Sequence, residues 1–333
     1  MRDTNSISGP LTISPNAPSF YSRYARELGL VGSILILLAV PMLFPHGSGF
    51  YTASVFRGLV MDNLSVLIAA IGMTLIILCA EIDISIAAQL AVCGVVAGTL
   101  SRLGLPIIVV IPVTIACGAV LGLINGALVS WLSIPSIVAT LAMWVLLENG
   151  LIVVTKGVWV QNLPDDFQWF GLGLQNGQIV FVTLALIVLG LFAFLLKKTE
   201  FGRSFYAVGC SHEAALRLRI QPKRVVSSAF VILGALMGLA AVIHYCRYPE
   251  IETGAGRGFE LQVIAAVVVG GTAISGGRGS LLGTLLGVIL MGVVTAVLAF
   301  TPLESTADKA VQGAIILIAV VADRVFQWGR GND

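Results

Sequence analysis

Long apolar runs separated by short polar breaks fill most of the chain. A membrane-spanning helix needs about 20 mostly apolar residues, so this pattern predicts a helical bundle that crosses a membrane rather than a barrel. The expected fold class is all-α, a polytopic membrane bundle of about ten helices. The predicted spans are 28–45, 58–80, 84–103, 106–132, 134–155, 178–197, 225–246, 261–276, 280–300 and 309–327.

The two ends of the chain are polar. Residues 1–27 are rich in Ser, Pro and Asn, which indicates a disordered tail, and 328–333 form a second short tail. The first apolar run begins too late for a signal peptide and lacks its cleavage site, so the first helix is expected to stay attached. One membrane domain over 28–327 is predicted between the tails.

Basic residues predict the orientation, because cytoplasmic loops are enriched in Lys and Arg. The segment 197–224 holds seven basic residues against Glu200 and Glu213, whereas the loop 156–177 holds one basic residue and two acids. The first segment is therefore expected in the cytoplasm, between the sixth and seventh spans. With ten spans, both termini are then cytoplasmic as well.

Composition supports a membrane protein and excludes several functions. The chain is 57% hydrophobic and 11% charged, with a mean hydropathy of +0.99. A net charge of +2 gives no reason to expect a nucleic-acid partner. The five cysteines lack metal-ligand spacing and are expected as core residues, so neither a metal nor a cofactor is predicted.

No catalytic constellation emerges from the sequence. The three histidines lie in separate loops, and no H-E-x-x-H or G-x-S-x-G motif occurs. A G-x-x-x-x-G-K-[ST] phosphate loop is also missing, so another chain would have to hydrolyse ATP if ATP drives this protein. The chain is predicted not to be an enzyme. A series of buried acids and bases is absent too, which disfavours an ion-coupled carrier.

Glycines recur at four-residue spacing, which places small residues on one helix face and lets helices approach closely in lipid. Tight packing within one bundle is the favoured interpretation, and a dimerisation face is the alternative. The positions are Gly94 and Gly98; Gly118, Gly122 and Gly126; Gly234 and Gly238; and Gly279, Gly283 and Gly287.

Two carboxylates, Glu81 and Asp83, interrupt the apolar stretch "GMTLIILCAEIDISIAAQLAV". Such groups cost about 2.5 to 3.5 kcal/mol each at bilayer depth, so we expect a helix break here, near the cytoplasm. Asp83 and Ser85 would then cap the next helix, and direct contact with a solute or ion is the alternative.

The stretch "LQVIAAVVVGGTAISGGRGSLLGTLLG" loosely resembles the stretch around Glu81 and Asp83, as internal repeats in transporters can. It also has an apolar run, a break ending in Ser and a small-residue helix. Gly270 and Gly271 lie at this second break. Together with Glu81, Asp83, Ser85 and Glu260, they are candidates for a translocation path or a helix break. Glu260 also opens the predicted eighth helix, where a carboxylate interacts favourably with the helix dipole.

Two external sites remain open in interpretation. Glu148 lies near the outer end of the fifth span, either between helices or at a solvated helix end. Arg247, Glu250 and Glu252 lie outside the membrane after the seventh span, where they would dock a soluble protein or form a solvated surface.

The cytoplasmic segment contains "HEAALRLRI", which is predicted to form a short helix. Ala214, Ala215 and Leu218 give it a small apolar surface beside Arg217 and Arg219. It would drop into a groove on a partner, or lie on the membrane surface.

Four ordered blocks resemble permease subunits of bacterial ATP-binding-cassette (ABC) importers of the ribose, xylose, rhamnose and autoinducer-2 class. These blocks cover roughly 58–325 and are "GMTLIILCAEIDISIA", "NGALVSWLSIPSIVATLAM", "KTEFGRSFYAVGCSHEAALRLRI" and "GRGFELQVIAAVVVGGTAISGGRGSLLGTLLG". The resemblance implies an inner-membrane permease that works as an identical or paralogous pair, with a cytoplasmic ATPase and a periplasmic solute-binding protein that delivers a monosaccharide. The segment with Glu213, Ala214, Ala215, Leu218 and Arg219 would be the coupling helix seated in the ATPase.

Two departures from the resembled family stand out. Positions 80 and 81 commonly carry glycine there but are Ala80 and Glu81 here, and Ser-Gly-Ile is replaced by Leu218, Arg219 and Ile220. Arg219 would tune the fit to one ATPase. A branched-chain amino-acid permease remains the nearest alternative function, followed by a stand-alone channel or an ion-coupled carrier.

Overall fold

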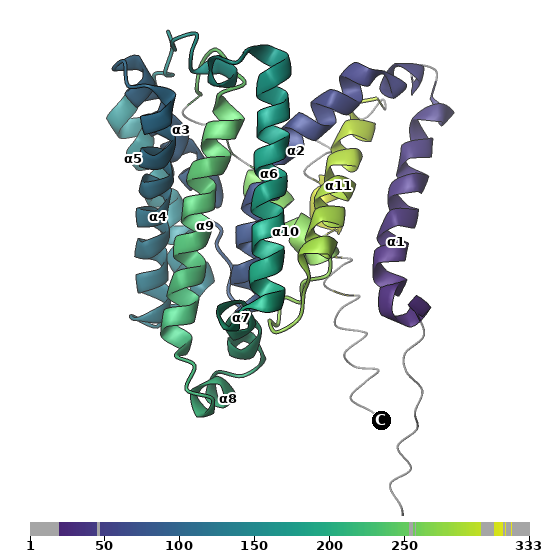
Figure 1. The fold of residues 1–333 in the computed structure, drawn as a ribbon, viewed down its shortest axis with the longest axis vertical. Helices are drawn as coiled ribbons and strands as arrows, with labels where there is room; N and C mark the ends of the chain where they lie inside the picture. The colour runs from purple at the N-terminus through teal and green to yellow at the C-terminus, as the bar shows by residue number, and fades with distance from the viewer. Residues whose placement is uncertain are drawn as a thin grey trace, which may run out of the picture.

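The computed structural model describes residues 20–44, 47–252, 256, 258–300, 310–315, 317 and 321 (Figure 1). In this part of the chain the fold is helical, with a single isolated β-bridge between Val160 and Ile251. The α-helices are α1 (Phe20–Ala39), α2 (Ala53–Leu78), α3 (Ile86–Arg102), α4 (Ile107–Ser130), α5 (Ser136–Thr155), α6 (Gly173–Lys198), α7 (Glu200–Cys210), α8 (His212–Arg217), α9 (Pro222–Tyr245), α10 (Phe259–Val269) and α11 (Leu281–Leu298). Three short 3₁₀ helices accompany them, at Val40–Leu43, Gly47–Tyr51 and Gln168–Gly171.

The helices are those of a polytopic membrane protein. Six of the described helices are long and apolar enough to cross a bilayer, namely α2, α4, α5, α6, α9 and α11. The shorter apolar helices are Glu27–Leu43, Ile86–Arg102 and Phe259–Val269. The predicted all-α membrane bundle is therefore confirmed.

One predicted span is wrong in its extent. The span expected over 261–276 is a helix only as far as Val269, because Gly270 ends it and Gly271 adopts a left-handed backbone with φ 104°. Helix α1 begins at Phe20, inside the range predicted for the polar tail. The expected span 309–327 and both terminal tails lie mostly outside the described residues.

Helices α4 and α9 lie side by side and touch through their backbones (Figure 1). A Cβ atom built on Gly118 would overlap the Gly234 carbonyl, and one on Gly122 would overlap that of Phe230. Gly238 meets Thr114 in the same way. The four-residue glycine spacing on these helices therefore serves packing within the bundle.

Helix α2 forms the centre of the bundle and packs against α9, α10 and α11. Its most apolar window is 83% buried, whereas the corresponding windows of α4, α5 and α6 are 22% buried and present apolar faces outward. Figure 1 places α7 and α8 at one end of the bundle, the end at which α1 begins; this is called the α8 end below. Cys79, Cys93 and Cys246 are buried, as expected of core residues, while Cys210 is exposed.

Candidate functional site

The helix break predicted at the paired carboxylates is present over residues 79–85, called the first break here. Helix α2 ends in a Schellman motif, in which the Glu81 amide donates to the Ile76 carbonyl at 3.2 Å and the Ala80 amide to that of Ile77 at 2.9 Å. Ala80 takes the left-handed conformation of this motif, with φ 63°. Glycine fits that conformation best, which explains why glycine is common at this position in the resembled family.

Asp83 is completely buried and accepts four hydrogen bonds. Its Oδ1 accepts from the Ser85 amide at 2.8 Å and from the Ser85 hydroxyl at 2.6 Å. Its Oδ2 accepts from the side-chain amides of Gln89 and Asn125, each at 3.1 Å. The same two amides also donate to the Ser85 hydroxyl oxygen, which closes the network across α3 and α4. We call these four residues the Asp83 network.

The predicted capping role of Asp83 and Ser85 is only partly right. Ser85 is the N-cap residue of α3, but its side chain makes no capping hydrogen bond because the hydroxyl is turned to Asp83. In the described residues the carbonyl oxygens of Gln89 and Asn125 are buried without a hydrogen-bond partner. A buried orphan acceptor costs about 1–3 kcal/mol, so both amides are held in this orientation by the carboxylate.

Hydroxyl groups at the start of α5 satisfy the extended backbone of the first break. The Ile82 amide donates to the Ser136 hydroxyl and the Ile84 amide to the Thr140 hydroxyl, both at 3.2 Å. Non-helical backbone inside a membrane bundle needs such partners because lipid offers none. The first break is thus fastened to α3, α4 and α5.

A second break, residues 270–280, separates α10 from α11. Gly276 and Gly277 adopt positive φ values of 81° and 70°. The Ala273 amide bonds to the Arg278 carbonyl at 2.8 Å, and the Ser280 hydroxyl caps α11 by accepting from the Gly283 amide at 3.0 Å. This break is satisfied largely by its own backbone.

The two breaks lie against each other. The Gly277 amide donates to the Leu78 carbonyl at 2.9 Å, at the last residue of α2. Nearby, the buried hydroxyls of Thr74 and Thr284 lie 2.8 Å apart and join α2 to α11. The two similar stretches of the sequence therefore correspond to two broken helix pairs that lie in contact.

The basic segment forms two consecutive capped helices at the α8 end. Thr199 caps α7 by accepting from the Gly202 amide at 2.9 Å, and Ser211 caps α8 by accepting from the Ala214 amide at 3.3 Å. Helix α8 ends in a Schellman motif with Arg219 left-handed, at φ 60°. Arg219 thus also occupies a backbone position suited to glycine.

The exposed face of α8 differs from the predicted one. Ala215 is buried within the chain at 1% exposure, so it is not available to a partner as expected. Leu216 and Leu218 are instead 58% and 71% exposed, and Glu213 and Ala214 are also exposed. The accessible surface of α8 therefore consists mainly of two leucines flanked by charged residues, whereas a patch of small residues was expected.

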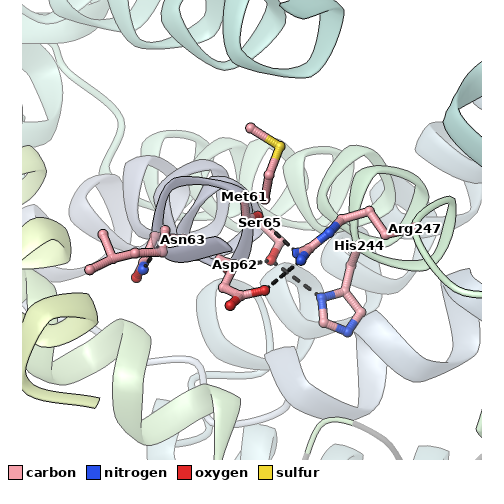
Figure 2. A network of polar contacts seen from close by, with 7 residues as sticks. Met61, Asp62, Asn63, Ser65, His244 and Arg247 are labelled. Carbon is pink, nitrogen blue, oxygen red and sulfur yellow. Dashed lines mark hydrogen bonds and ion pairs between the residues drawn. The ribbon is translucent and has the colours of Figure 1, made fainter. Parts of the chain in front are cut away.

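At the opposite end of the bundle, Arg247 is fixed to α2 rather than free (Figure 2). It donates to the Met61 carbonyl at 2.9 Å and forms an ion pair with Asp62. His244 lies beside it, with Nδ1 at 3.5 Å from the Ser65 hydroxyl. The predicted docking role of Arg247 would therefore have to act through this anchored position.

Two segments at this opposite end are held together as one surface. Val160 and Ile251 exchange two backbone hydrogen bonds of 3.0 and 2.9 Å, and the Gln161 amide donates to the Glu250 carboxylate at 3.1 Å. Glu252 is exposed beside this bridge. We call residues 158–161 and 250–252 the bridged loops.

Glu260 and Gly270 are structural in their contacts. The Glu260 carboxylate accepts from the Gly258 amide at 3.1 and 3.2 Å and so stabilises the start of α10. Gly270 packs so closely on Gly283 that a Cβ would overlap its carbonyl. Glu148 is partly buried on α5.

The sequence did not lead us to four polar residues of this site. Gln89, Asn125, Ser136 and Thr140 lie inside predicted apolar spans. The signal available was a polar side chain at bilayer depth, since such residues face the interior of a bundle. Their common partner, the first break, appears only when α3, α4 and α5 are packed together.

A membrane bundle in which two broken helix pairs lie against each other, with a buried polar network at one of the breaks, has the architecture of a membrane transporter. The comparisons with known proteins define the class further. Residues 55–320 match a family model described as "Branched-chain amino acid transport system / permease component". The chain belongs to this family of transport-system permeases, so it is a transport component and not itself an enzyme.

Three relatives illustrate the similarity. The ribose import permease protein RbsC of Escherichia coli (strain K12) is 32% identical over 91% of this chain and 94% of its own length. The autoinducer 2 import system permease protein LsrC of Shigella flexneri is 32% identical over 90% and 86%. The probable ABC transporter permease protein YphD of Escherichia coli (strain K12) is 35% identical over 96% of both chains. No solved structure matches the chain.

Proposed function

We propose that this chain is the permease subunit of an ATP-binding-cassette importer that admits a monosaccharide of the ribose, rhamnose or autoinducer-2 type. The observation that carries the proposal is the 32% identity to a ribose import permease over 91% of the chain. The autoinducer 2 relatives support the same substrate class. The family description names branched-chain amino acids instead, so these are the second candidate substrate.

An uptake assay separates the two substrates. The chain would be produced with the ATPase and binding protein encoded beside it, in a strain that lacks its own ribose and branched-chain amino-acid importers. We expect ATP-dependent uptake of labelled ribose, rhamnose or autoinducer 2, and none of leucine. Uptake of leucine alone would establish the amino-acid function and refute the sugar assignment.

The topology proposed for this importer has ten spans and both termini in the cytoplasm. Two facts support it: the basic segment 197–224 includes α7 and α8, and α1 begins at the same end of the bundle (Figure 1). The domain is taken as 28–327, in the bacterial inner membrane. Cys210 provides a test, since it is exposed while Cys79, Cys93 and Cys246 are buried. A membrane-impermeant maleimide should label it in inverted vesicles and not in intact cells; the reverse pattern would contradict the topology.

Helix α8 is proposed as the coupling helix that docks on the ATPase. Its support is the exposed pair Leu216 and Leu218, together with flanking Glu213 and Arg219, at the basic end of the bundle. ATP-driven movement at α8 would then rock the permease pair and alternate access to a central path. The second permease of this pair is either an identical copy of the chain or a paralogue.

Substitutions at Ala214 and Ala215 distinguish an effect on docking from an effect on folding, because Ala214 is exposed and Ala215 is buried. Ala214→Trp should abolish most uptake while leaving the melting temperature of the permease alone unchanged. Ala215→Trp should lower that melting temperature as well, since a buried overpacked side chain costs about 1–3 kcal/mol. Normal uptake by a correctly inserted Ala214→Trp variant would refute the coupling role of α8.

The bridged loops are proposed as the docking surface for the periplasmic binding protein. Two paired segments give a preformed platform, and Glu250 and Glu252 lie on it. Arg247 would support the platform through its ion pair with Asp62. The first and second breaks, with Asp83, Ser85, Gly270 and Gly271, are proposed to border the translocation path.

A further inference from the structure

Glu81 is the carboxylate of the first break that has no place in the Asp83 network. It lies outside the membrane-spanning helices and is only partly exposed. Its side chain lines a pocket of about 320 Å³ at the α8 end. The pocket is mixed in character, with hydroxyl, imidazole, ammonium and apolar groups around the carboxylate.

The walls of this pocket come from four parts of the chain. Glu81 belongs to the first break, His212 is the first residue of α8, and Lys223 lies in the first turn of α9. Ser133 and its neighbours supply the fourth wall from the α4–α5 connection. The pocket therefore joins the start of the proposed coupling helix to the break that holds Asp83.

The charges around the pocket favour an attraction between Glu81 and α8. His212 faces Glu81 from α8 and Lys223 from α9, and both groups are cationic when protonated. Burial raises the pKa of the Glu81 carboxyl, while a hydrogen bond with Ser136 and the nearby His212 oppose this rise. Protonation of Glu81 on acidification would remove the attraction.

A second connection runs through the last turn of α7. A Cβ atom on Gly209 would overlap the Leu78 carbonyl and lie 2.6 Å from the Gly277 amide nitrogen. Helix α7 therefore packs closely against the last residue of α2, next to the first break, and against Gly277 of the second break, directly before α8 begins. A displacement of α8 that pivots on this close contact moves His212 relative to Glu81.

We propose that Glu81 is a positioning residue for coupling, which restrains the start of α8 relative to the first break by electrostatic attraction to His212 across the shared pocket. Movement of α8 thereby reaches the backbone held by Ser136 and Thr140 and, two residues further on, Asp83. The inference rests on the proposed role of α8 as the coupling helix. It adds a residue that passes on the movement without itself touching the ATPase or the sugar.

Substitutions test this role in proteoliposomes that contain the complete transporter. Glu81→Gln should lower the amount of solute imported per ATP hydrolysed about two- to fivefold, the effect of losing the attraction between one partly exposed charge and its surroundings. Glu81→Asp should restore most of it, and Glu200→Gln, an exposed carboxylate at the other end of α7, should behave as wild type.

The pH profile distinguishes positioning from a merely structural contribution. Burial raises the pKa of Glu81, so the wild-type ratio should fall on acidification as this carboxylate becomes protonated, and the Glu81→Gln profile should be flatter. A Glu81→Gln transporter with the wild-type ratio and pH profile would overturn the proposal.

A crosslink gives a readout that does not require the substrate to be known. In a Cys210→Ser background, Glu81→Cys and His212→Cys would be joined by a short reducible bifunctional thiol reagent, and the linked peptides identified by mass spectrometry. We expect a crosslink in membranes, loss of the ATP hydrolysis stimulated by the binding protein, and recovery after reduction.

The outcomes separate the two hypotheses. Failure of the wild type to import any sugar, with the crosslink formed and hydrolysis responsive to it, refutes the substrate assignment and supports the role of Glu81. Absence of the crosslink, or full stimulated hydrolysis in the crosslinked transporter, refutes the role of Glu81 whatever the substrate.

Discussion

The first and second breaks satisfy their unpaired backbone groups in two different ways. Both interrupt a helix inside the bundle and both must satisfy the freed backbone groups away from water. The first break uses side chains from three helices: Gln89 of α3, Asn125 of α4, and Ser136 and Thr140 of α5. The second uses left-handed glycines and its own backbone, with Ser280 as a cap.

This difference has a consequence for movement. The first break is tied to α3, α4 and α5, so it cannot shift without them. The second break is held by its own backbone, by its hydrogen bond to Leu78, and by Tyr206 and Cys210 of α7, which donate to the Gly279 and Gly277 carbonyls. We infer that the first break determines the conformation that the two breaks adopt together, and that the second break adjusts to it.

The largest expected effect is at Asp83. Asp83→Ala should lower the free energy of unfolding by about 3 kcal/mol, since the buried Ser85 amide loses its acceptor and the Gln89 and Asn125 amides keep only the Ser85 hydroxyl. Ser280→Ala in the second break should cost only about 1 kcal/mol, as for the loss of a helix cap. Unfolding of both variants in detergent measures the difference. Equal losses would contradict the proposed inequality of the two breaks.

Gly209→Ala should have an intermediate effect, about 1–3 kcal/mol, because the new methyl group would separate α7 from both breaks at once. Uptake should fall with it. Gly190→Ala in α6 is the matched control, since a Cβ at Gly190 would meet no atom within 4 Å apart from the adjacent backbone of its own helix. An uptake rate for Gly209→Ala equal to that of Gly190→Ala would show that α7 is not coupled to the breaks.

The smallest effect is expected at Ala80, where the first break has an alanine in a left-handed conformation and the second has glycines. Ala80→Gly should stabilise the protein by about 1 kcal/mol by relieving this strain. Gly276→Ala, at φ 81°, should be destabilising. Melting temperatures that move in these opposite directions would confirm the backbone interpretation; a loss of stability in Ala80→Gly would rule it out.

Much of the fold followed from simple patterns. Apolar length identified the spans, and the charges of Glu81 and Asp83 located the first break because carboxylates are costly in lipid. The glycine spacing predicted close packing within the bundle, and the structure places that packing between α4 and α9. The end of α10 was missed because the residues after Val269 are small and uncharged, so no costly carboxylate marks this break as it marks the first one.

The partners in the site were less predictable. Asn125 lies 42 residues from Asp83, and nothing in its local sequence names the carboxylate as its acceptor. The burial of Ala215 likewise depends on the packing of α8 against the bundle. The two departures from the resembled family became interpretable only through dihedral angles, since Ala80 and Arg219 both occupy left-handed positions.

The contact between α4 and α9 also constrains how the protein is made. The two helices meet through glycine backbones, yet four α-helices lie between them along the chain. During synthesis α4 must therefore enter the bilayer and wait until residues 222–245 have left the ribosome. Until then the glycine face of α4 lacks the helix that packs against it, so the final packing of the first half of the chain depends on the second half.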